Sequence, residues 1–341
     1  MNEKIILVFD AFLDAIEIKE IKIIQSGLIN NTYQINSLSG QFILQQLNQN
    51  VFHNIKTLIE NKIKITHFLK NIGFPTVTYL QTKQGLYFYN NDNEIWQLSI
   101  YIPSVIKEKI DSTIIAKHAG KHLAQFHEAL LDFPIDELGY TIPDFHNTIK
   151  RYEDFLDQIK TAAKERLAFS KNEIEKINHY YTKIKKVARA IQQKTIPVRV
   201  VHNDTKISNM LFDKFEKIIC IIDYDTVMPG SILHDVGDAL RSGTNTSTED
   251  EVDLNLVNFN SKIYDAFMKS YLKKAKSFMT KDELENIHLS LPLLLFEQSC
   301  RFLGDYLNHD QYYVVKYDTQ NLIRTKTQLR LLDQVCDYLK I

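Results

Sequence analysis

Residues 198–241 of the chain read VRVVHNDTKISNMLFDKFEKIICIIDYDTVMPGSILHDVGDALR, and this stretch decides the fold. It contains two apolar runs, Val198–Val201 and Ile218–Ile222, whose β-branched residues predict two buried strands. Polar groups follow each run where the predicted strand ends, so the chain places charged side chains at the rim of a core. After the first run come His202, Asp204, Lys206 and Asn209, and after the second come Asp223 and Asp225.

The spacing of these polar residues fits the transfer of a phosphoryl group from a metal-bound nucleotide to an alcohol. This reaction passes through a loose transition state, so the protein mainly positions groups and neutralises charge. Asp204 can accept the proton of an acceptor hydroxyl, and Lys206 can reach the transferring phosphate as a cation. Asn209 and Asp223 offer oxygen ligands to Mg²⁺, which completes its shell with phosphate oxygens and water. We therefore interpret Asp204 and Lys206 as catalytic residues. Asn209 and Asp223 are interpreted as metal ligands.

Length and composition exclude several other classes. The 341 residues are too many for one small core and predict two lobes or domains. A balance of 41 Lys and Arg against 42 Asp and Glu gives no net field for nucleic acid or an acidic membrane surface. The N-terminal apolar run is broken by Asp10 and Asp14, which makes it a poor signal peptide. Cys220, Cys300 and Cys336 lie in apolar settings and read as reduced core residues, so we expect a cytoplasmic protein without a membrane span.

The first hundred residues predict a small, mostly β lobe. Apolar residues at helical spacing predict a leading helix over 3–19 and a second helix over 52–71. Alternating and β-branched segments bounded by turn residues predict the strands of this lobe. These strands are expected at 21–24, 32–35, 42–47, 76–81, 86–90 and 96–102.

After Pro103 the pattern becomes helical. The expected helices lie at 112–131, 145–168, 171–194, 252–274, 280–308 and 319–339. The fold class is therefore α+β, with a small β-rich lobe over residues 1–102, an extended hinge, and a large, mostly helical lobe over residues 103–341 that carries the polar cluster.

The quoted stretch resembles the aminoglycoside phosphotransferase family, the small-molecule branch of the protein-kinase-like fold. Within that family HNDTKISNMLFD, IIDYDTVMPG and HDVGDALRSGTNT are most similar to the N-acetylhexosamine 1-kinase group. Fragments elsewhere fit the same group, namely GLINNTYQI and FILQQLN early, IWQLSIYIPS at the hinge and RFLGDYLNHDQYY late. The resemblance thus touches both lobes and implies a two-lobed kinase that uses ATP and Mg²⁺.

The resemblance also implies roles for single residues in the large lobe. Asp204 becomes the catalytic base, with Asn209 and Asp223 as metal ligands. The second carboxylate of the Asp-Tyr-Asp run is implied in binding Mg²⁺ or the sugar, and an aspartate further on in supporting the catalytic loop. Arg301 and Tyr312 match positions that face the sugar, where an Arg fork and a Tyr hydroxyl suit an amide carbonyl and ring hydroxyls. The substrate set is Asp225, Arg301 and Tyr312, and the supporting set is His202 and Asp235.

The small lobe and hinge are expected to bind the nucleotide, with adenine against the strand near Leu98–Ile102. Protein kinases cover the phosphates with a glycine-rich loop and contact them with a lysine on the third strand. Here the corresponding turn, Ser26–Asn31, has one glycine, and the third strand carries Gln45 in place of a lysine. Backbone and amide groups, Lys206 and the metal ions would then have to bind the phosphates and neutralise their charge. The expected nucleotide-binding residues are Asn30, Asn31, Thr32, Gln45, Leu98 and Tyr101.

Several features admit two interpretations. His118 and His122 stand at i, i+4 spacing that can bind zinc, but packing against the active-site loops is the favoured reading. Glu60 is either the partner of a strand lysine or a solvated residue. Arg301 either binds the sugar or forms a surface or interdomain ion pair.

The resulting functional hypothesis is a kinase that phosphorylates the anomeric hydroxyl of an N-acetylhexosamine. Other small alcohols remain alternatives, namely an aminoglycoside, choline or homoserine. A non-catalytic, nucleotide-binding pseudokinase is the alternative from another class, motivated by the missing strand lysine. Aminoglycosides predict several carboxylates around the acceptor, whereas an N-acetylhexosamine predicts Arg301 and Tyr312 there.

Overall fold

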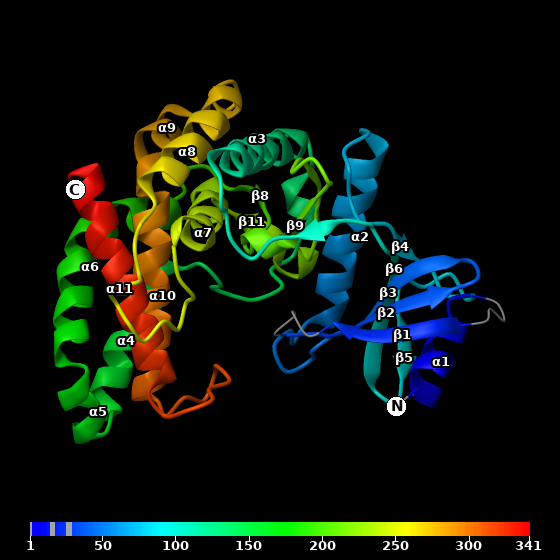
Figure 1. The fold of residues 1–341 in the computed structure, drawn as a ribbon, viewed down its shortest axis with the longest axis horizontal. Helices are drawn as coiled ribbons and strands as arrows, with labels where there is room; N and C mark the ends of the chain where they lie inside the picture. Colours follow the sequence, from blue (N-terminus) through cyan, green and yellow to red (C-terminus); the bar gives the residue numbers. More distant parts are fainter. Residues whose placement is uncertain (1, 14–17, 25–28) are drawn as a thin grey trace.

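The computed structural model describes residues 2–13, 18–24 and 29–341. It has an α+β fold with a β-sheet lobe at the N-terminal end of the chain and a larger helical lobe (Figure 1). The small lobe has a leading helix, α1, and an antiparallel sheet in the order β1-β2-β3-β6-β4, with β5 paired to β6. Its elements are α1 (Asn2–Asp10), β1 (Ile18–Ile24), β2 (Asn31–Ser37), β3 (Gly40–Gln46), α2 (Ile55–Asn71), β4 (Tyr79–Leu80), β5 (Tyr89–Asn91) and β6 (Glu94–Ile100).

The two faces of the sheet have different partners because successive strand side chains point to opposite sides. Phe42 and Leu44 of β3 pack with Phe9 of α1, and Trp96 and Leu98 of β6 belong to the same buried cluster. Ile43 of β3 and Gln97 of β6, which alternate with these residues, therefore face the other side of the sheet, toward the large lobe. The alternation fixes which β3 side chains are available to a ligand between the lobes.

Helix α2 lies between the sheet and the centre of the large lobe (Figure 1). It begins at Asn54, whose side chain accepts a hydrogen bond from the Thr57 amide, an N-cap that satisfies one of the free amides of the first turn. Its buried face contains Leu58 and Leu69, as the helical spacing predicted, and also Ile65 and a lysine, whereas His67, predicted on or near this face, is exposed.

The large lobe is built around α10 (Ser290–Leu307), of whose 18 residues 16 are buried. Helices α4, α6, α7 and α11 pack on it. The other elements of this lobe are β7 (Val105–Ile106), α3 (Thr113–Ala129), α4 (Thr148–Thr161), α5 (Lys164–Phe169), α6 (Lys171–Gln192), β8 (Arg199–Val201), β9 (Met210–Phe212), β10 (Ile218–Ile221), β11 (Met228–Gly230), α7 (Ile232–Thr244), α8 (Ser261–Ala275), α9 (Lys281–Asn286) and α11 (Gln320–Leu339).

Two predicted helices were too long. The helix predicted over 3–19 ends at Asp10; residues 14–17 lie outside the described part, and Ile18 already begins strand β1, which pairs with β2. The helix predicted over 252–274 begins only at Ser261. Before it, the Asp253 carboxylate accepts a hydrogen bond from the Asn255 amide at 3.0 Å, a local turn that competes with helix formation.

Two other predicted helices are interrupted. The segment 145–168 contains α4 and α5, and 280–308 contains α9, a short 3₁₀ turn and α10. All three cysteines are free and buried, as expected. None of the described helices combines the length and apolar surface needed to cross a lipid bilayer. Strand β7 already pairs with β9, which supports our proposal that the lobes divide between residues 102 and 103.

Candidate active site

The polar cluster predicted from residues 198–241 is assembled by two small antiparallel strand pairs. Strand β8 pairs with β11, and β9 pairs with β10, so the loop 202–209 and the turn after β10 lie side by side. The Ile222 amide donates to the Asn209 carbonyl at 2.9 Å. His202 Nε2 lies 2.9 Å from the Ile222 carbonyl, which ties the loop to the end of β10.

The side chain of Asp235 on α7 binds the backbone of the loop 202–209. Its carboxylate accepts hydrogen bonds from the amides of His202 at 2.9 Å and Asn203 at 2.7 Å, and its own carbonyl accepts from the Thr205 hydroxyl. Burial alone would raise the pKa of this carboxyl, but the hydrogen bond from His127 and the field of His202 hold the pKa below its ordinary value. The supporting roles expected for His202 and Asp235 stand as proposals consistent with these contacts.

Asp204, Lys206 and Asn209 converge in the loop. The Lys206 ammonium lies 2.7 Å from Asp204 Oδ2, and the Asn209 amide nitrogen donates to the same oxygen at 2.9 Å. Burial would raise the pKa of Asp204, but Lys206 keeps it below the ordinary value. Oδ1 of Asp204 has no hydrogen-bond partner among the described residues, so it can accept a proton. The side-chain nitrogen of Asn209 donates to Asp204. The side-chain oxygen of Asn209, Oδ1, is therefore available as a ligand.

Asp223 follows β10 in a left-handed backbone conformation with φ +68°. Burial and the nearby carboxylates of Asp225 and Asp204 raise its pKa to about 7. No cation is paired with this carboxylate among the described residues, which is the electrostatic condition that a metal ion relieves. No group of three or more His, Cys, Asp or Glu side chains in the described chain is arranged to hold a metal. Carboxylate and amide oxygens such as those of Asp223 and Asn209 are ligands that Mg²⁺ uses, and this ion needs few protein ligands.

Asp225 has both carboxylate oxygens occupied by residues of the small lobe. Lys62 Nζ of α2 lies 2.6 Å from Oδ1, and Asn30 Nδ2 lies 2.6 Å from Oδ2. The carboxylate thus joins the lobes in this structure. A role of Asp225 in binding the sugar, which the sequence suggested, would require one of these contacts to open.

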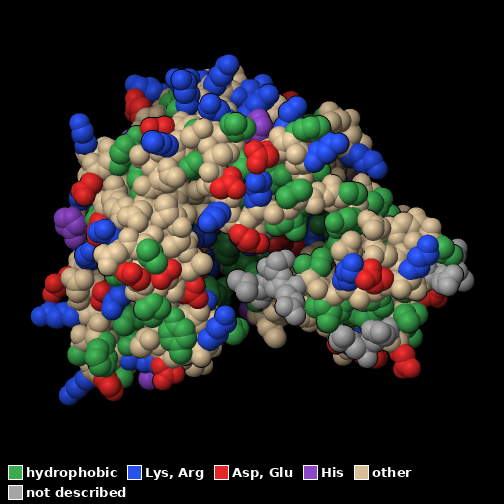
Figure 2. All heavy atoms as spheres, viewed as in Figure 1, with side chains coloured by type: hydrophobic (Ala, Val, Ile, Leu, Met, Phe, Trp, Pro, Cys, Tyr) green, Lys and Arg blue, Asp and Glu red, His purple; other side chains and the backbone are tan. Residues whose placement is uncertain are grey.

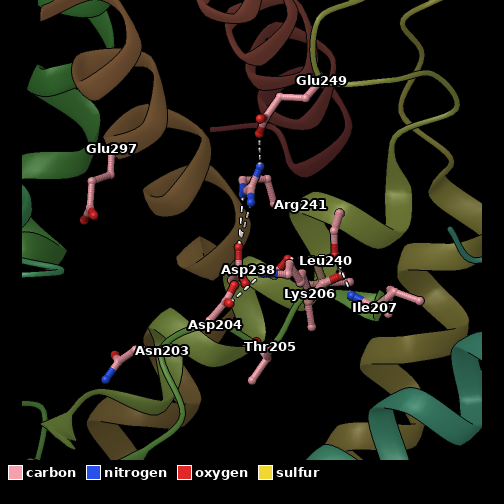
Figure 3. A network of polar contacts seen from close by, with 12 residues as sticks. Asn203, Asp204, Thr205, Lys206, Ile207, Asp238, Leu240, Arg241, Glu249 and Glu297 are labelled. Carbon is pink, nitrogen blue, oxygen red and sulfur yellow. Dashed lines mark hydrogen bonds and ion pairs between the residues drawn. The ribbon is translucent and has the colours of Figure 1, made fainter. Parts of the chain in front are cut away.

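A second carboxylate lies beside the predicted base. Asp238 Oδ1 accepts hydrogen bonds from Arg241 at 2.9 and 3.1 Å. The same guanidinium also donates to the Glu249 carboxylate at 2.6 Å. Figure 3 shows Asp238 next to Asp204 and Lys206, with Arg241 and Glu249 on the other side of Asp238. Oδ2 of Asp238 is buried without a hydrogen-bond partner. Burial and the Asp204 carboxylate raise the pKa of Asp238 even though Arg241 opposes them.

Arg301 lies on α10 one turn after Glu297, which is fully buried. His146 bridges this carboxylate, at 2.7 Å, to the Asn203 carbonyl at 3.2 Å, next to the predicted base. Against the effect of burial, His146 lowers the pKa of Glu297 to about 2. The Arg301 guanidinium stacks 5.1 Å from the Phe145 ring.

Tyr312 is 61% exposed, and its amide is held by Asp305 at 2.8 Å. The charge of Arg301 interacts with Tyr313, Glu297 and Tyr312. The structure therefore brings Arg301 and Tyr312 together. The surface hollow between the lobes has acidic side chains at its upper edge (Figure 2).

The nucleotide residues expected in the small lobe lie at different places. Residues 26–28 of the predicted phosphate turn lie outside the described part of the chain. Gln45 Nε2 lies 3.4 Å from Thr32 Oγ1, and Asn31 donates to Gln46 at 2.9 Å. The Leu98 side chain is fully buried against α1, so only its backbone can contact adenine. The Tyr101 amide is engaged by the Gln41 carbonyl at 3.0 Å.

The residues with two interpretations behave mostly as packing residues. His118 contacts the Glu216 carbonyl at 2.6 Å, and His122 is buried beside Phe74. Glu60 is half-exposed and lies 3.8 Å from Lys56, as the solvated interpretation predicted.

Sequence reasoning missed five residues that the structure places around the site. Lys62 carried a signal, because it is a lysine at a position of the apolar stripe of α2. Asp238 and Arg241 carried another, since they follow Asp235 at helical spacing. His146 and Glu297 had no comparable signal, whereas His127 follows His118 and His122 on the helix that was expected to pack against the active-site loops.

Known proteins resemble this chain in sequence and in fold. The family model described as "Phosphotransferase enzyme family" matches residues 20–267. Spectinomycin phosphotransferase in complex with ADP and spectinomycin is similar over 99% of this chain and 98% of that one, with a TM-score of 0.67 and 16% identity. A microcompartment-associated aminopropanol kinase matches 99% of this chain and 98% of its own, with a TM-score of 0.67 and 12% identity. Choline kinase from Cryptosporidium parvum Iowa II matches 100% and 96%, with a TM-score of 0.59 and 16% identity. At these identities the similar structures establish the two-lobed fold.

Proposed function

Because the chain belongs to the phosphotransferase enzyme family, we propose that it is an ATP- and Mg²⁺-dependent kinase of a small, neutral sugar. The proposed acceptor is the anomeric hydroxyl of an N-acetylhexosamine. Nucleotide is proposed to bind between the lobes, with adenine against the Leu98–Ile102 segment.

The compensation of charge around the base is the observation that carries this choice of acceptor. Apart from Asp223, which is proposed to bind the metal, the carboxylates around the base are paired with basic side chains, and Arg301 adds a further guanidinium. A cationic aminoglycoside or choline would gain from carboxylates that lack such partners. Several similar structures are kinases named for amino compounds, and the paired carboxylates here favour a different, uncharged acceptor. The paired groups are Asp204 with Lys206, Asp238 with Arg241, and Glu297 with His146.

The residues of the chain suit the chemistry of the transfer. Oδ1 of Asp204 is free to accept the proton of the acceptor hydroxyl as its oxygen attacks the γ-phosphorus of ATP and ADP leaves. Lys206 lies beside the base, where its charge can stabilise the transferring phosphoryl group.

The residues present fit Mg²⁺. The Asn209 carbonyl and the unpaired Asp223 carboxylate would hold the ion. When bound, Mg²⁺ neutralises phosphate charge and orients the nucleotide. This assignment rests on the free oxygen of the amide and on the uncompensated carboxylate.

An acceptor panel tests the proposal. Purified protein would be supplied with ATP and Mg²⁺ and with N-acetylglucosamine, N-acetylgalactosamine, hexoses, aminoglycosides, choline and homoserine, and ADP release would be followed. The proposal expects the highest kcat/KM with an N-acetylhexosamine, and a product that has lost its reducing end. A preference for an amino compound would overturn the choice of acceptor. Nucleotide binding without turnover of any acceptor would favour the pseudokinase alternative.

A further inference from the structure

Strand β3 carries no positive charge where kinase-like folds place one against the nucleotide phosphates. It ends in Gln45 and Gln46, whose side chains are engaged by Thr32 and Asn31 of the neighbouring strand. Neutral amides can donate hydrogen bonds to a phosphate but cannot neutralise its charge. The chain therefore needs a cation from another element.

Helix α2 presents such a cation at the junction of the lobes. The side chain of Lys62 is 0% exposed, and its ammonium lies 2.6 Å from Asp225 Oδ1 and 5.1 Å from the centre of the Tyr79 ring. Lysines are almost never buried this fully, because removing the ammonium from water is costly. An apolar residue at this position would stabilise the helix packing as well or better. Stability alone therefore does not account for Lys62.

The position of Lys62 relates it to the phosphate side of the site. Its partner Asp225 lies two residues after Asp223, whose charge also acts on Lys62. The other oxygen of Asp225 accepts the 2.6 Å hydrogen bond from Asn30, at the end of the turn expected to cover the phosphates. The Asn30 carbonyl oxygen in turn accepts from the Asn48 amide at 3.0 Å. Asp225 thus links Lys62 of α2 to Asn30 of the small lobe, just after the end of strand β10.

The helix that carries Lys62 is fastened to the large lobe. The side chain of the preceding residue, Asn61, donates to the carbonyls of Val227 at 2.9 Å and Gly139 at 2.7 Å, and accepts from the Gly139 amide at 3.1 Å. A Cβ at Gly139 would lie 2.5 Å from Thr57 Cγ2, so the helix and this loop approach closely. The lysine is therefore held in a defined place before any ligand arrives.

We infer that Lys62 supplies, from helix α2, the positive charge toward the nucleotide phosphates that strand β3 lacks. Asp225 holds the ammonium group in position. In protein kinases the strand carries the lysine and the helix carries its carboxylate partner. In this chain the helix carries the lysine, and the carboxylate follows the metal-site strand. The inference rests on the proposed kinase function.

The test compares how much binding affinity each variant loses for ligands that carry phosphates and for a ligand that does not. Binding of ATP·Mg²⁺, ADP·Mg²⁺ and adenosine to the full chain would be measured by titration calorimetry for wild type and Lys62→Met. Removal of a charged contact should raise the Kd for ATP·Mg²⁺ by about tenfold or more and leave that for adenosine unchanged. Lys56→Met on the exposed face of the same helix is the matched control and should change neither constant.

Lys62→Met leaves Asp225 as a buried, unpaired carboxylate, so the double variant Lys62→Met/Asp225→Asn covers the case in which the single variant does not fold. It should show the same selective loss for ATP·Mg²⁺. Equal losses for ATP·Mg²⁺ and adenosine would show that Lys62 only anchors the helix, and unchanged constants would also overturn the inference. If wild type itself bound neither ATP·Mg²⁺ nor ADP·Mg²⁺, the proposed function would fail instead.

Discussion

His127 on helix α3 and Asp235 on helix α7 are 108 residues apart in sequence, and their Nε2 and Oδ2 atoms lie 3.0 Å apart in the core. The other ring nitrogen of His127 contacts the Tyr271 hydroxyl at 2.9 Å. Because Asp235 also accepts hydrogen bonds from the amides of His202 and Asn203, a series of buried polar contacts runs from α8 through α3 and α7 to the loop 202–209. The loop geometry therefore depends on side chains of α3 and α8, which lie far from the loop in sequence.

Replacement of Asp235 by alanine should destabilise the chain. Two buried amides would lose their acceptor, and each such loss costs about 1–3 kcal/mol, so the free energy of unfolding should fall by about 2–6 kcal/mol. Urea unfolding followed by circular dichroism measures this change. Asp318→Ala, at an exposed carboxylate, is the control and should have no effect. An Asp235→Ala variant as stable as wild type would contradict this series of buried polar contacts.

Asp204→Asn should abolish turnover while nucleotide binding stays within about twofold, since the base acts on the acceptor and not on ATP. A drop in kcat of at least about 100-fold is expected for the loss of a general base. Steady-state kinetics and nucleotide titration measure the two effects separately. Asp136→Asn, at an exposed position, is the control. Unchanged turnover in Asp204→Asn would remove this residue from the role of base.

Arg301→Ala should raise the KM for the sugar more than the KM for ATP. Loss of a charged hydrogen-bond donor costs about 10–100-fold in affinity for the group it binds. Arg301→Lys should recover only part of this loss, because an ammonium does not reproduce the guanidinium fork that stacks on Phe145. Arg330→Ala on the exposed side of α11 is the matched control. Equal increases in both KM values would place Arg301 outside the sugar site.

Acid should destabilise the fold through His234. Burial lowers the pKa of this imidazole from 6.5 to about 3, and neither ring nitrogen has a hydrogen-bond partner in the described structure. Between pH 6.5 and about pH 3, this histidine is therefore protonated in the unfolded chain and neutral in the folded chain. The free energy of unfolding that is present above pH 6.5 is lost progressively as the pH falls toward 3. The contribution is about 1.4 kcal/mol per pH unit within this window.

Urea unfolding of wild type and His234→Phe at pH 7 and pH 5 tests this prediction. The fall in stability between the two pH values should be about 2 kcal/mol smaller in the variant. His122, whose pKa burial lowers to about 4, contributes in the same direction and remains in both proteins. An identical fall in both would mean that His234 takes up its proton in the folded chain.

Most of the large elements were predictable because their apolar residues recur at helical or strand spacing. The strands over 32–35 and 42–47 and the helix over 319–339 lie within one to three residues of β2, β3 and α11. The prediction failed where a side chain bonds a nearby backbone amide, as Asp253 does with Asn255, and where a long helix is broken by a turn, as before α10. Short strands such as β7 and β11 were missed because two or three residues carry no period.

The sequence by itself determined the fold class, the phosphotransferase family and the ordered set Asp204, Lys206, Asn209 and Asp223. These properties depend on local spacing along one stretch of chain. Only the tertiary structure decided which charges meet: that Lys62 lies on Asp225, that Arg241 neutralises Asp238, and that Asp223 is left unpaired among the described residues. Such pairings join helices far apart in sequence, and their energies depend on burial and distances of a few ångströms, which no local pattern encodes.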